Sequence, residues 1–290
     1  MKYTTQNFKD GDVLSATHLN NIETGIIEAS RDYNTNVKSI NHRGFNSVAP
    51  ENTLPAYYLS AEMGFKYVEA DVSFTKDNVA VLLHDATIDR TSNGKGNINS
   101  LTFEHVRQYD FGSWKSAAYA GTKIPTFQEF IVACKRLALH PYIELKSSAT
   151  YTEAQIQNIV DTVRYVGMQG KVTYISFNST YLEYVKNYDA SARLGYLVKR
   201  TGGFNQTDID VVLDLKTDTN EVFLDARHME GYEDVKDAQV QLCINNNVPL
   251  EVWSTNDETV IKNMSHYISG VTTDNVIVGE ILYKNYDTTK

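Results

Sequence analysis

Cysteine is scarce in this chain, and long apolar runs are absent from it. The only cysteines among the 290 residues are Cys134 and Cys243, which excludes a disulfide framework and favours buried thiols. No stretch is apolar for long enough to span a bilayer. The start of the chain lacks the apolar segment of a secretory signal peptide, so we expect a protein that is cytoplasmic when made.

An excess of basic residues is also lacking. Lys and Arg number 27 against 36 Asp and Glu, which gives a formal net charge of −9. A general nucleic-acid binder is therefore not expected, although a local basic pocket is compatible with this balance. Hydrophobic residues make up 42% and charged residues 22%, as in globular rather than disordered proteins.

Residues 1–36 differ from the rest of the chain. Asp10-Gly11-Asp12 is a turn signal, and Ser15 can cap a helix over about residues 16–31. The apolar positions of this helix form a narrow stripe of Leu19, Ile22, Ile26 and Ile27. Such a stripe either packs on the main domain or mediates self-association, because a narrow seam is typical of coiled coils.

From residue 37 to residue 290, short apolar strands alternate with helical patterns, which indicates an α/β fold with a parallel sheet. Eight repeats over about 250 residues is the size of a TIM (β/α)8 barrel. The expected strands are Ser39–His42, Tyr67–Phe74, Val79–His84, Pro141–Leu145, Val172–Phe177, Arg193–Val198, Glu221–Asp225, Pro249–Ser254 and Gly270–Thr273. The expected helices include Leu54–Met63, Phe127–Leu139, Glu153–Val166, Thr180–Tyr188, Asp234–Asn246 and Glu258–Met264.

The nine expected strands are one more than a (β/α)8 barrel contains, and a short polar turn between two of them accounts for the extra strand. The segment between Phe74 and Val79 is too short for a parallel crossover, so the two strands around it are expected to form an inserted hairpin. With Asp77-Asn78 as a two-residue turn, Asp71 faces His84 across the hairpin.

Four charged residues share the C-terminal ends of two strands, where barrel enzymes place their active sites. Glu69 and Asp71 point the same way, as do Glu144 and Lys146. Three converging carboxylates repel one another, and a divalent cation would resolve this; all-oxygen ligation favours Mg²⁺ or Ca²⁺. The alternative is that Glu69 and Asp71 are exposed and that Glu144 pairs with Lys146.

His42-Arg43-Gly44 follows the first strand at the same rim. The Arg43 guanidinium suits a phosphate group. Two histidines, His42 and His84, beside the carboxylates suggest an acid and a base on either side of a reacting bond. The alternative is that they are structural residues.

These motifs, taken together, resemble the glycerophosphodiester phosphodiesterase family. The similarity runs in unbroken order from Ser39 to about Asp274. It rests on His42-Arg43-Gly44, Pro50-Glu51-Asn52-Thr53, Glu69-Ala70-Asp71, Thr75 to Val79, His84-Asp85, Asp89-Arg90-Thr91, Gly96, Ile124-Pro125-Thr126, Ile143 to Lys146, Val252 to Asn256 and Gly270 to Asp274.

The resemblance implies a barrel with the inserted hairpin and assigns a role to each site residue. Glu69, Asp71 and Glu144 would hold the metal, and His42 and His84 would be the acid/base pair. Arg43 and Lys146 would bind the phosphate, and Trp253 would either line the alcohol pocket or pack in the core. The family's reaction uses a glycerol hydroxyl as internal nucleophile and passes through a cyclic phosphate, which water then opens.

Other residues are left with open roles. Asp225 and His228 come at the end of a predicted strand, and either reach the barrel mouth or lie on the surface. The remaining histidines, His18, His105, His140 and His266, are expected to be surface or structural residues.

The segment from Asp10 to Ile26 resembles the leader of tail and baseplate proteins from phages of Gram-positive bacteria. This implies a virion-associated enzyme, a homotrimer formed through residues 1–36, and a cell-wall glycerophosphate polymer such as teichoic acid as substrate instead of a small diester. The competing hypotheses are a non-catalytic phage adhesin that binds this polymer and a relative that cleaves choline phospholipids.

Overall fold

The computed structural model describes residues 37–146, 150–229, 232–257, 264 and 267–275. The helix expected over residues 16–31 lies outside the described residues, as does nearly all of the helix expected over Glu258–Met264. Cys134 and Cys243 are both buried and form no disulfide, as predicted.

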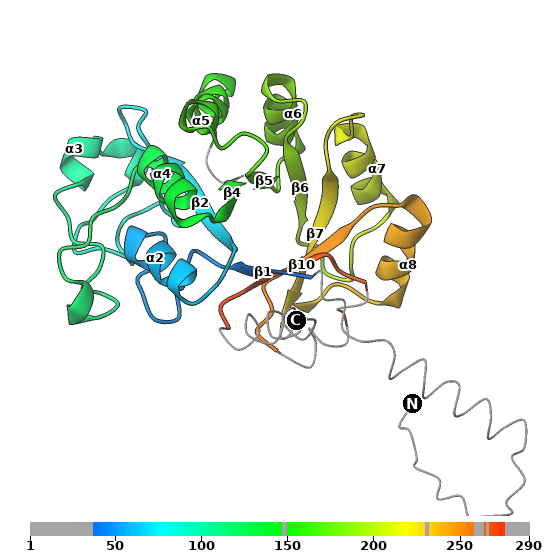
Figure 1. The fold of residues 1–290 in the computed structure, drawn as a ribbon, viewed down its shortest axis with the longest axis horizontal. Coiled ribbons are helices and arrows are strands. Elements are labelled where there is room, and N and C mark those ends of the chain that lie inside the picture. Colours follow the sequence, from blue (N-terminus) through cyan, green and yellow to red (C-terminus); the bar gives the residue numbers. More distant parts are fainter. Residues whose placement is uncertain (1–36, 147–149, 230–231, 258–263, 265–266, 276–290) are drawn as a thin grey trace, which may run out of the picture.

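Eight parallel strands close into a barrel, which confirms the predicted fold (Figure 1). The strand order returns on itself, because β1 pairs with both β10 and β2. The barrel strands are β1 Lys38–Asn41, β2 Tyr67–Phe74, β4 His140–Leu145, β5 Thr173–Ser176, β6 Arg193–Val198, β7 Val222–Met229, β9 Leu250–Trp253 and β10 Gly270–Thr273. Closure leaves the barrel without edge strands and brings every strand's C-terminal end to one rim.

Helices cover the outside of the barrel (Figure 1). They are α2 Leu54–Glu62, α4 Phe127–Leu137, α5 Glu153–Val166, α6 Ser179–Tyr188, α7 Gln206–Leu215 and α8 Asp237–Asn246. Thr126, Thr152 and Asn205 begin α4, α5 and α7 with capping boxes, which satisfy backbone N–H groups at those ends. None of the helices in the described ranges is long and apolar enough to cross a membrane.

Several elements are not among those predicted. They are α7, the two-residue strand β8 Tyr232–Glu233, which pairs with β7, and three short helices after β3 Ala80–Leu82: η1 Ile98–Ser100, α3 Phe103–Val106 and η2 Ala117–Tyr119. Of these, η1 and α3 contribute to a small separate core that includes Ile88, Val106 and Phe111. The strand β7 also continues four residues beyond the predicted end at Asp225.

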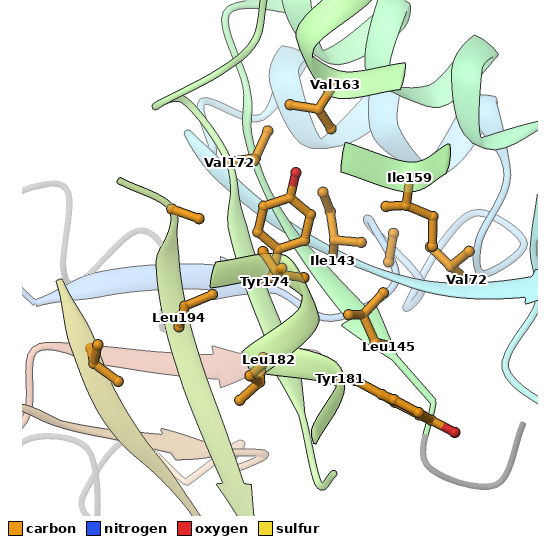
Figure 2. Packing of buried hydrophobic residues seen from close by; sticks show 14 of the residues in the cluster. Val72, Ile143, Leu145, Ile159, Val163, Val172, Tyr174, Tyr181, Leu182 and Leu194 are labelled. Carbon is orange, nitrogen blue, oxygen red and sulfur yellow. The ribbon is translucent and has the colours of Figure 1, made fainter. Parts of the chain in front are cut away.

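Alternate residues of each strand point outward and inward. Outward-facing residues such as Val72, Ile143 and Leu194 pack against Ile159 and Val163 of α5 and Leu182 of α6 (Figure 2). Inward-facing apolar residues form a separate layer inside the barrel, which comprises Ile40, Tyr142, Ile175, Leu197 and Phe223. This layer fills the barrel below its mouth, so the barrel is a packed core and no pore.

Below that layer, the strand beginnings hold a buried ion pair. Arg193 donates to Glu251 at 2.7 Å, and Lys38 lies 3.2 Å from the same carboxylate. The Arg193 guanidinium also lies over the ring of Phe223, 4.1 Å from its centroid. Glu251 is buried, so the positive charges of Arg193 and Lys38 are needed to stabilise its ionised carboxylate inside the barrel.

The inserted hairpin is present, but its predicted register is wrong by one residue. β2 pairs antiparallel with β3 Ala80–Leu82, and Val72 lies opposite Leu82. The loop has three residues, because Thr75 donates to the carbonyl of Val79 and Asn78 adopts a left-handed conformation at φ 60°. This three-residue loop is one residue longer than the predicted two-residue turn at Asp77-Asn78. Leu83, rather than His84, therefore lies opposite Asp71, and its N–H donates to the Asp71 carbonyl at 3.0 Å.

Replacing Arg193 tests the buried pair. Arg193→Met leaves the Glu251 charge with Lys38 alone, and we expect the free energy of unfolding to fall by about 3–5 kcal/mol. Urea denaturation measures this change. Arg164→Met, which removes an exposed pair with Asp161, is the control and should cost about 0–1 kcal/mol. Equal losses in the two variants would contradict a stabilising role for the buried pair.

Candidate active site

A cavity of about 430 Å³ lies at the C-terminal ends of the barrel strands. Its wall consists of inward-facing residues from β2, β4, β5, β6, β7, β9 and β10 and of residues just beyond the ends of strands. The lining residues are His42, Arg43, Glu69, His84, Glu144, Lys146, Ile175, Phe177, Leu197, Lys199, Asp225, Trp253, Ser254 and Thr272. All the predicted site residues are in this set except Asp71, which lies buried next to it.

Three carboxylates converge at one side of this cavity. Glu69 and Asp71 come from β2 and Glu144 from β4, where Asp71 and Glu144 are in register. One carboxylate oxygen of each lies within 4.8 Å of the others. The residues Glu69 and Asp71 are 3% and 1% exposed, so the alternative that they are exposed strand residues is wrong.

Positive charges compensate only part of this cluster. Lys146 Nζ lies 3.1 Å from both Asp71 Oδ1 and Glu144 Oε1, so the pairing of Glu144 with Lys146 that the alternative proposed does form. Arg43 Nε lies 3.3 Å from Asp71 Oδ2, and Asn52 donates to the same oxygen at 2.7 Å. Among the described residues, Glu69 Oε1 is buried with no hydrogen-bond partner.

The uneven compensation separates the pKa values of the three carboxyl groups. Burial raises the pKa of Glu69 well above its usual range, and Asp71 and Glu144 raise it further. Burial and Asp71 likewise raise the pKa of Glu144, to about 7. Burial would also raise the pKa of Asp71, but Lys146 and Arg43 outweigh it and lower that pKa. The cluster therefore needs further positive charge to be fully ionised.

A divalent cation fits this need. The donor set is all carboxylate oxygen, which suits Mg²⁺ or Ca²⁺ rather than zinc. The buried, unpartnered Glu69 Oε1 has the lone pairs of a ligand but no donor to satisfy them. The residues present thus fit the metal site that the sequence predicts.

The turn after β1 positions Arg43 against the cluster. Arg43 and Gly44 both adopt positive φ angles, of 54° and 76°. A side chain at Gly44 would place Cβ 2.8 Å from the Cβ of Ala56, so glycine is required there. This tight turn aims the Arg43 N–H at Glu69 Oε2, 2.9 Å away, while the guanidinium reaches Asp71.

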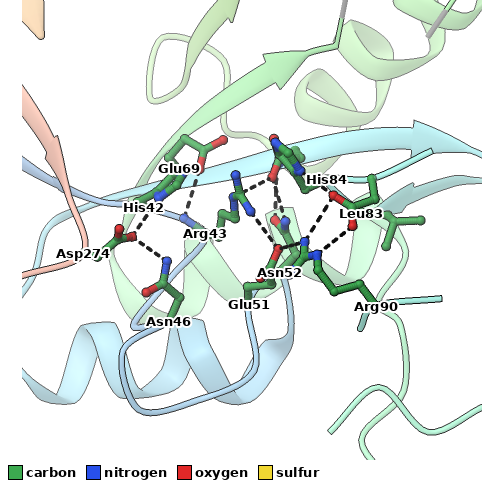
Figure 3. Close-up of polar contacts among 12 residues, drawn as sticks. His42, Arg43, Asn46, Glu51, Asn52, Glu69, Leu83, His84, Arg90 and Asp274 are labelled. Atoms are coloured by element: carbon green, nitrogen blue, oxygen red, sulfur yellow. Dashed lines mark hydrogen bonds and ion pairs between the residues drawn. The ribbon is translucent and has the colours of Figure 1, made fainter. Parts of the chain in front are cut away.

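Each of the two histidines is held by a carboxylate (Figure 3). His42 Nδ1 lies 2.7 Å from Asp274 Oδ1, and His84 Nδ1 lies 2.7 Å from Asp85 Oδ1. Burial would raise the pKa of Asp274, but hydrogen bonds from His42 and Asn46 lower it to about 2. An ionised carboxylate only accepts hydrogen bonds, so His42 Nδ1 carries a proton and Nε2 is the nitrogen left for proton transfer.

A chain of ion pairs fixes Asp85. Arg90 binds Asp85 at 2.7 Å and also binds Glu51 at 2.7 Å, and Glu51 accepts from Arg43 at 2.8 Å. Hydrogen bonds from Arg90 lower the pKa of Asp85 to about 2. The His84 pKa is lowered, chiefly by burial and against the pull of Asp71. His84 lines the cavity, although the hairpin register differs by one residue from the predicted one.

The opposite wall of the cavity is largely apolar. Trp253 lines it, packs against the interior layer and meets Phe177 edge-to-face at 5.4 Å. Its Nε1–H donates to the backbone carbonyl of Asp225 at 3.1 Å. Asp225 reaches the cavity, whereas His228 is buried and does not line it.

Among the described residues, His105 and His140 do not line the cavity. His105 is exposed on α3 beside Tyr109, and His140 lies 2.9 Å from Thr173 Oγ1 at the start of β4. His18 and His266 lie outside the described residues.

The supporting carboxylates were not assigned a role from the sequence, although Glu51, Asp85 and Asp274 all stand inside the motifs quoted above. Asp85 directly follows His84, and Asp274 directly follows the last strand, at the same rim as the first. A carboxylate next to a histidine, or at the end of a barrel strand, is the signal that could have identified them.

Comparisons with known proteins identify the family of this chain. A model of the glycerophosphoryl diester phosphodiesterase family matches residues 42–278. A glycerophosphodiester phosphodiesterase of Caldanaerobacter subterraneus subsp. tengcongensis is 32% identical over 54% of this chain and 65% of its own length. Glycerophosphodiester phosphodiesterase 1 of Mus musculus is 39% identical over 42% of this chain and 38% of its own length. The matches thus span less than two thirds of these relatives.

Solved structures share the fold. A phosphodiesterase of Oleispira antarctica, in complex with the product sn-glycerol-3-phosphate, is 22% identical with a TM-score of 0.69, covering 85% of this chain and 96% of that one. A glycerophosphodiester phosphodiesterase of Parabacteroides distasonis is 23% identical with a TM-score of 0.67, covering 87% and 99%. At these identities, the likeness concerns the fold alone.

The raised pKa of Glu69 predicts a pH-dependent stability. Above its usual value of 4.5 the unfolded state loses this proton while the folded state keeps it, so the free energy of unfolding should fall as pH rises. In EDTA, we expect wild type to lose stability relative to Glu69→Gln as the pH rises above the usual glutamate pKa of 4.5. His84 also makes the stability depend on pH, because its pKa is lowered in the folded protein. Comparing the two proteins removes this effect, since both contain His84.

Thermal melts of both proteins measure this effect. Added Mg²⁺ or Ca²⁺ should reverse the loss in wild type, because the cation stabilises the ionised carboxylates, and should have a much smaller effect on Glu69→Gln. A cation response that is the same in both proteins would contradict the metal site.

Proposed function

The chain belongs to the glycerophosphoryl diester phosphodiesterase family, and on that premise we propose that it hydrolyses glycerophosphodiesters to an alcohol and glycerol phosphate. One observation carries the proposal: His42 and His84, each bound to a carboxylate, line the same cavity as the three-carboxylate cluster. The glycerophosphodiester phosphodiesterase of Caldanaerobacter subterraneus, and the product bound to the Oleispira antarctica enzyme, support the same reaction class.

Glu69, Asp71 and Glu144 would hold one divalent cation, Mg²⁺ or Ca²⁺. When bound, this cation would offset the charge of the phosphate and acidify the attacking hydroxyl. Arg43 and Lys146 line the same side of the cavity and would bind the phosphate oxygens. Trp253, on the other wall, would contact the alcohol.

The two histidines would transfer the protons. The 2-hydroxyl oxygen of the glycerol forms a bond to phosphorus, and the bond from phosphorus to the leaving alcohol breaks, which leaves a cyclic phosphate. One histidine takes the hydroxyl proton at Nε2, and the other gives its Nε2 proton to the leaving oxygen. Water then opens the ring, and the histidines exchange roles. Asp274 and Asp85 hold both rings with Nε2 available.

This arrangement favours an enzyme over the non-catalytic adhesin, because binding alone does not require two oriented histidines. The substrate is either a small diester or a cell-wall glycerophosphate polymer such as teichoic acid. Polymer cleavage would accompany virion association, which rests on the resemblance of residues 10–26 to phage tail leaders.

Histidine variants test the reaction. We expect His42→Ala and His84→Ala each to lower kcat by roughly 10²–10⁴, the usual contribution of positioned acid/base groups. His105→Ala, on the exposed side of α3, is the control and should be unchanged. The assay measures alcohol release from glycerophosphocholine and from poly-glycerophosphate, with and without EDTA. Full activity in EDTA, or in either alanine variant, would contradict the mechanism.

Residues 1–36 generate a separate prediction. We propose that they mediate self-association, as a trimer, because their apolar stripe precedes a barrel that needs no strand from them. A chain beginning at Val37 should retain activity on small diesters, since every proposed site residue follows it. Light scattering on both chains measures the oligomeric state. A monomeric full chain, or a shortened chain that fails to fold, would indicate that the helix packs on the barrel.

A further inference from the structure

Asp225 is a buried carboxyl group on the cavity wall that the proposed reaction does not use. It lies on β7, two residues after Phe223, so both side chains point into the barrel. The residue is 1% exposed and lines the cavity with Leu197, Lys199 and Trp253. Its neighbours across the sheet are Leu197 on β6 and Glu251 on β9.

One oxygen of this side chain has no hydrogen-bond partner in the part of the chain that the structure describes. Among the described residues, no group donates to or accepts from Asp225 Oδ1, which is fully buried. A buried polar atom without a hydrogen bond costs about 1–3 kcal/mol. Because the carboxyl group borders the cavity, the missing partner can come from a molecule that occupies it.

The charges around Asp225 decide which kind of partner fits. Burial raises the pKa of Asp225 well above its usual range, and Glu251 raises it further, against the opposing effect of Arg193. The raised pKa favours the protonated form of the carboxyl group, which can both donate and accept one hydrogen bond. Lys199 lines the same wall, and its positive charge disfavours a cationic alcohol such as choline. A neutral hydroxyl group matches both features.

The place of Asp225 indicates which part of the substrate it meets. The carboxylate cluster comes from β2 and β4, and its cations Arg43 and Lys146 follow β1 and β4. On the other side, Asp225 and Trp253 lie on β7 and β9, and Phe177 follows β5. With the phosphate and the attacking hydroxyl on the first side, the group that extends across the cavity is the leaving alcohol.

We infer that Asp225 forms a hydrogen bond with a hydroxyl group of the leaving alcohol and so selects polyol alcohols, such as glycerol or a sugar, over alkyl and cationic ones. This inference rests on the proposed function. It makes Asp225 a specificity residue, separate from the groups that transfer protons. The apolar surfaces of Leu197, Phe177 and Trp253 would pack against the carbon skeleton of the same alcohol.

Two diesters that differ only in the alcohol test the inference. The full chain, with Mg²⁺ or Ca²⁺ added, is assayed on glycerophosphoglycerol and on the propyl ester of glycerol phosphate. We expect wild type to prefer the glycerol ester by roughly 10-fold or more in kcat/KM, since the propyl group leaves Asp225 unpartnered. Asp225→Asn should keep this preference because the amide still donates and accepts, and Asp225→Val should lose it. Asp214→Val, on the exposed face of α7, is the control.

The outcomes separate the two proposals. No hydrolysis of either ester by wild type would overturn both the proposed function and this inference. Hydrolysis of both esters at equal rates would overturn the inference alone, and it needs no variant to fold. A preference for glycerophosphocholine that is lost in Asp225→Asn would also overturn it, because it would mean that an anionic Asp225 binds a cation.

Discussion

Repulsion among three buried carboxylates is the constraint on which the site depends. Glu69, Asp71 and Glu144 meet within a few ångströms at a rim where water is largely excluded. Burying such charges without compensation is costly. Lys146 and Arg43 neutralise Asp71, and Glu69 keeps an oxygen that no described residue satisfies. The left-handed turn at Arg43 and Gly44 places the Arg43 N–H against Glu69 and the Arg43 guanidinium against Asp71. This loop therefore supplies both a hydrogen-bond donor and a positive charge to the carboxylate cluster.

The closed barrel makes this concentration of charge possible. Alternate residues of each strand point inward. Residues far apart in the chain, such as Asp71 and Glu144, therefore lie side by side on the paired strands β2 and β4. The apolar layer below them and the Arg193–Glu251 pair at the strand beginnings close the barrel underneath. The packed interior of the barrel therefore offsets the unfavourable free energy of holding like charges together at the rim.

The two histidines depend on a second set of carboxylates. Asp274 holds His42 from the last strand, so the first and last strands of the barrel must pair for this contact to form. Asp85 holds His84, and Arg90 and Glu51 connect that contact to Arg43. His84 and the carboxylate cluster thus share one polar network (Figure 3), which runs through Asp85, Arg90, Glu51 and Arg43. A change at Glu51 would affect Arg43 and Arg90 together.

The sequence by itself determined the barrel, because alternation of apolar strands and amphipathic helices is a local property of the chain. It also determined which residues meet at the rim, since side-chain direction along a strand follows from spacing alone, as for Glu69 with Asp71. Only the tertiary structure decided the hairpin register, because Asn78 accepts a left-handed conformation that lengthens the turn by one residue. It also decided which carboxylate holds each histidine and that Asp225 is buried on the cavity wall. The contact of His42 with Asp274 and the burial of Asp225 depend on pairing between strands distant in the chain, for which spacing within one strand carries no information.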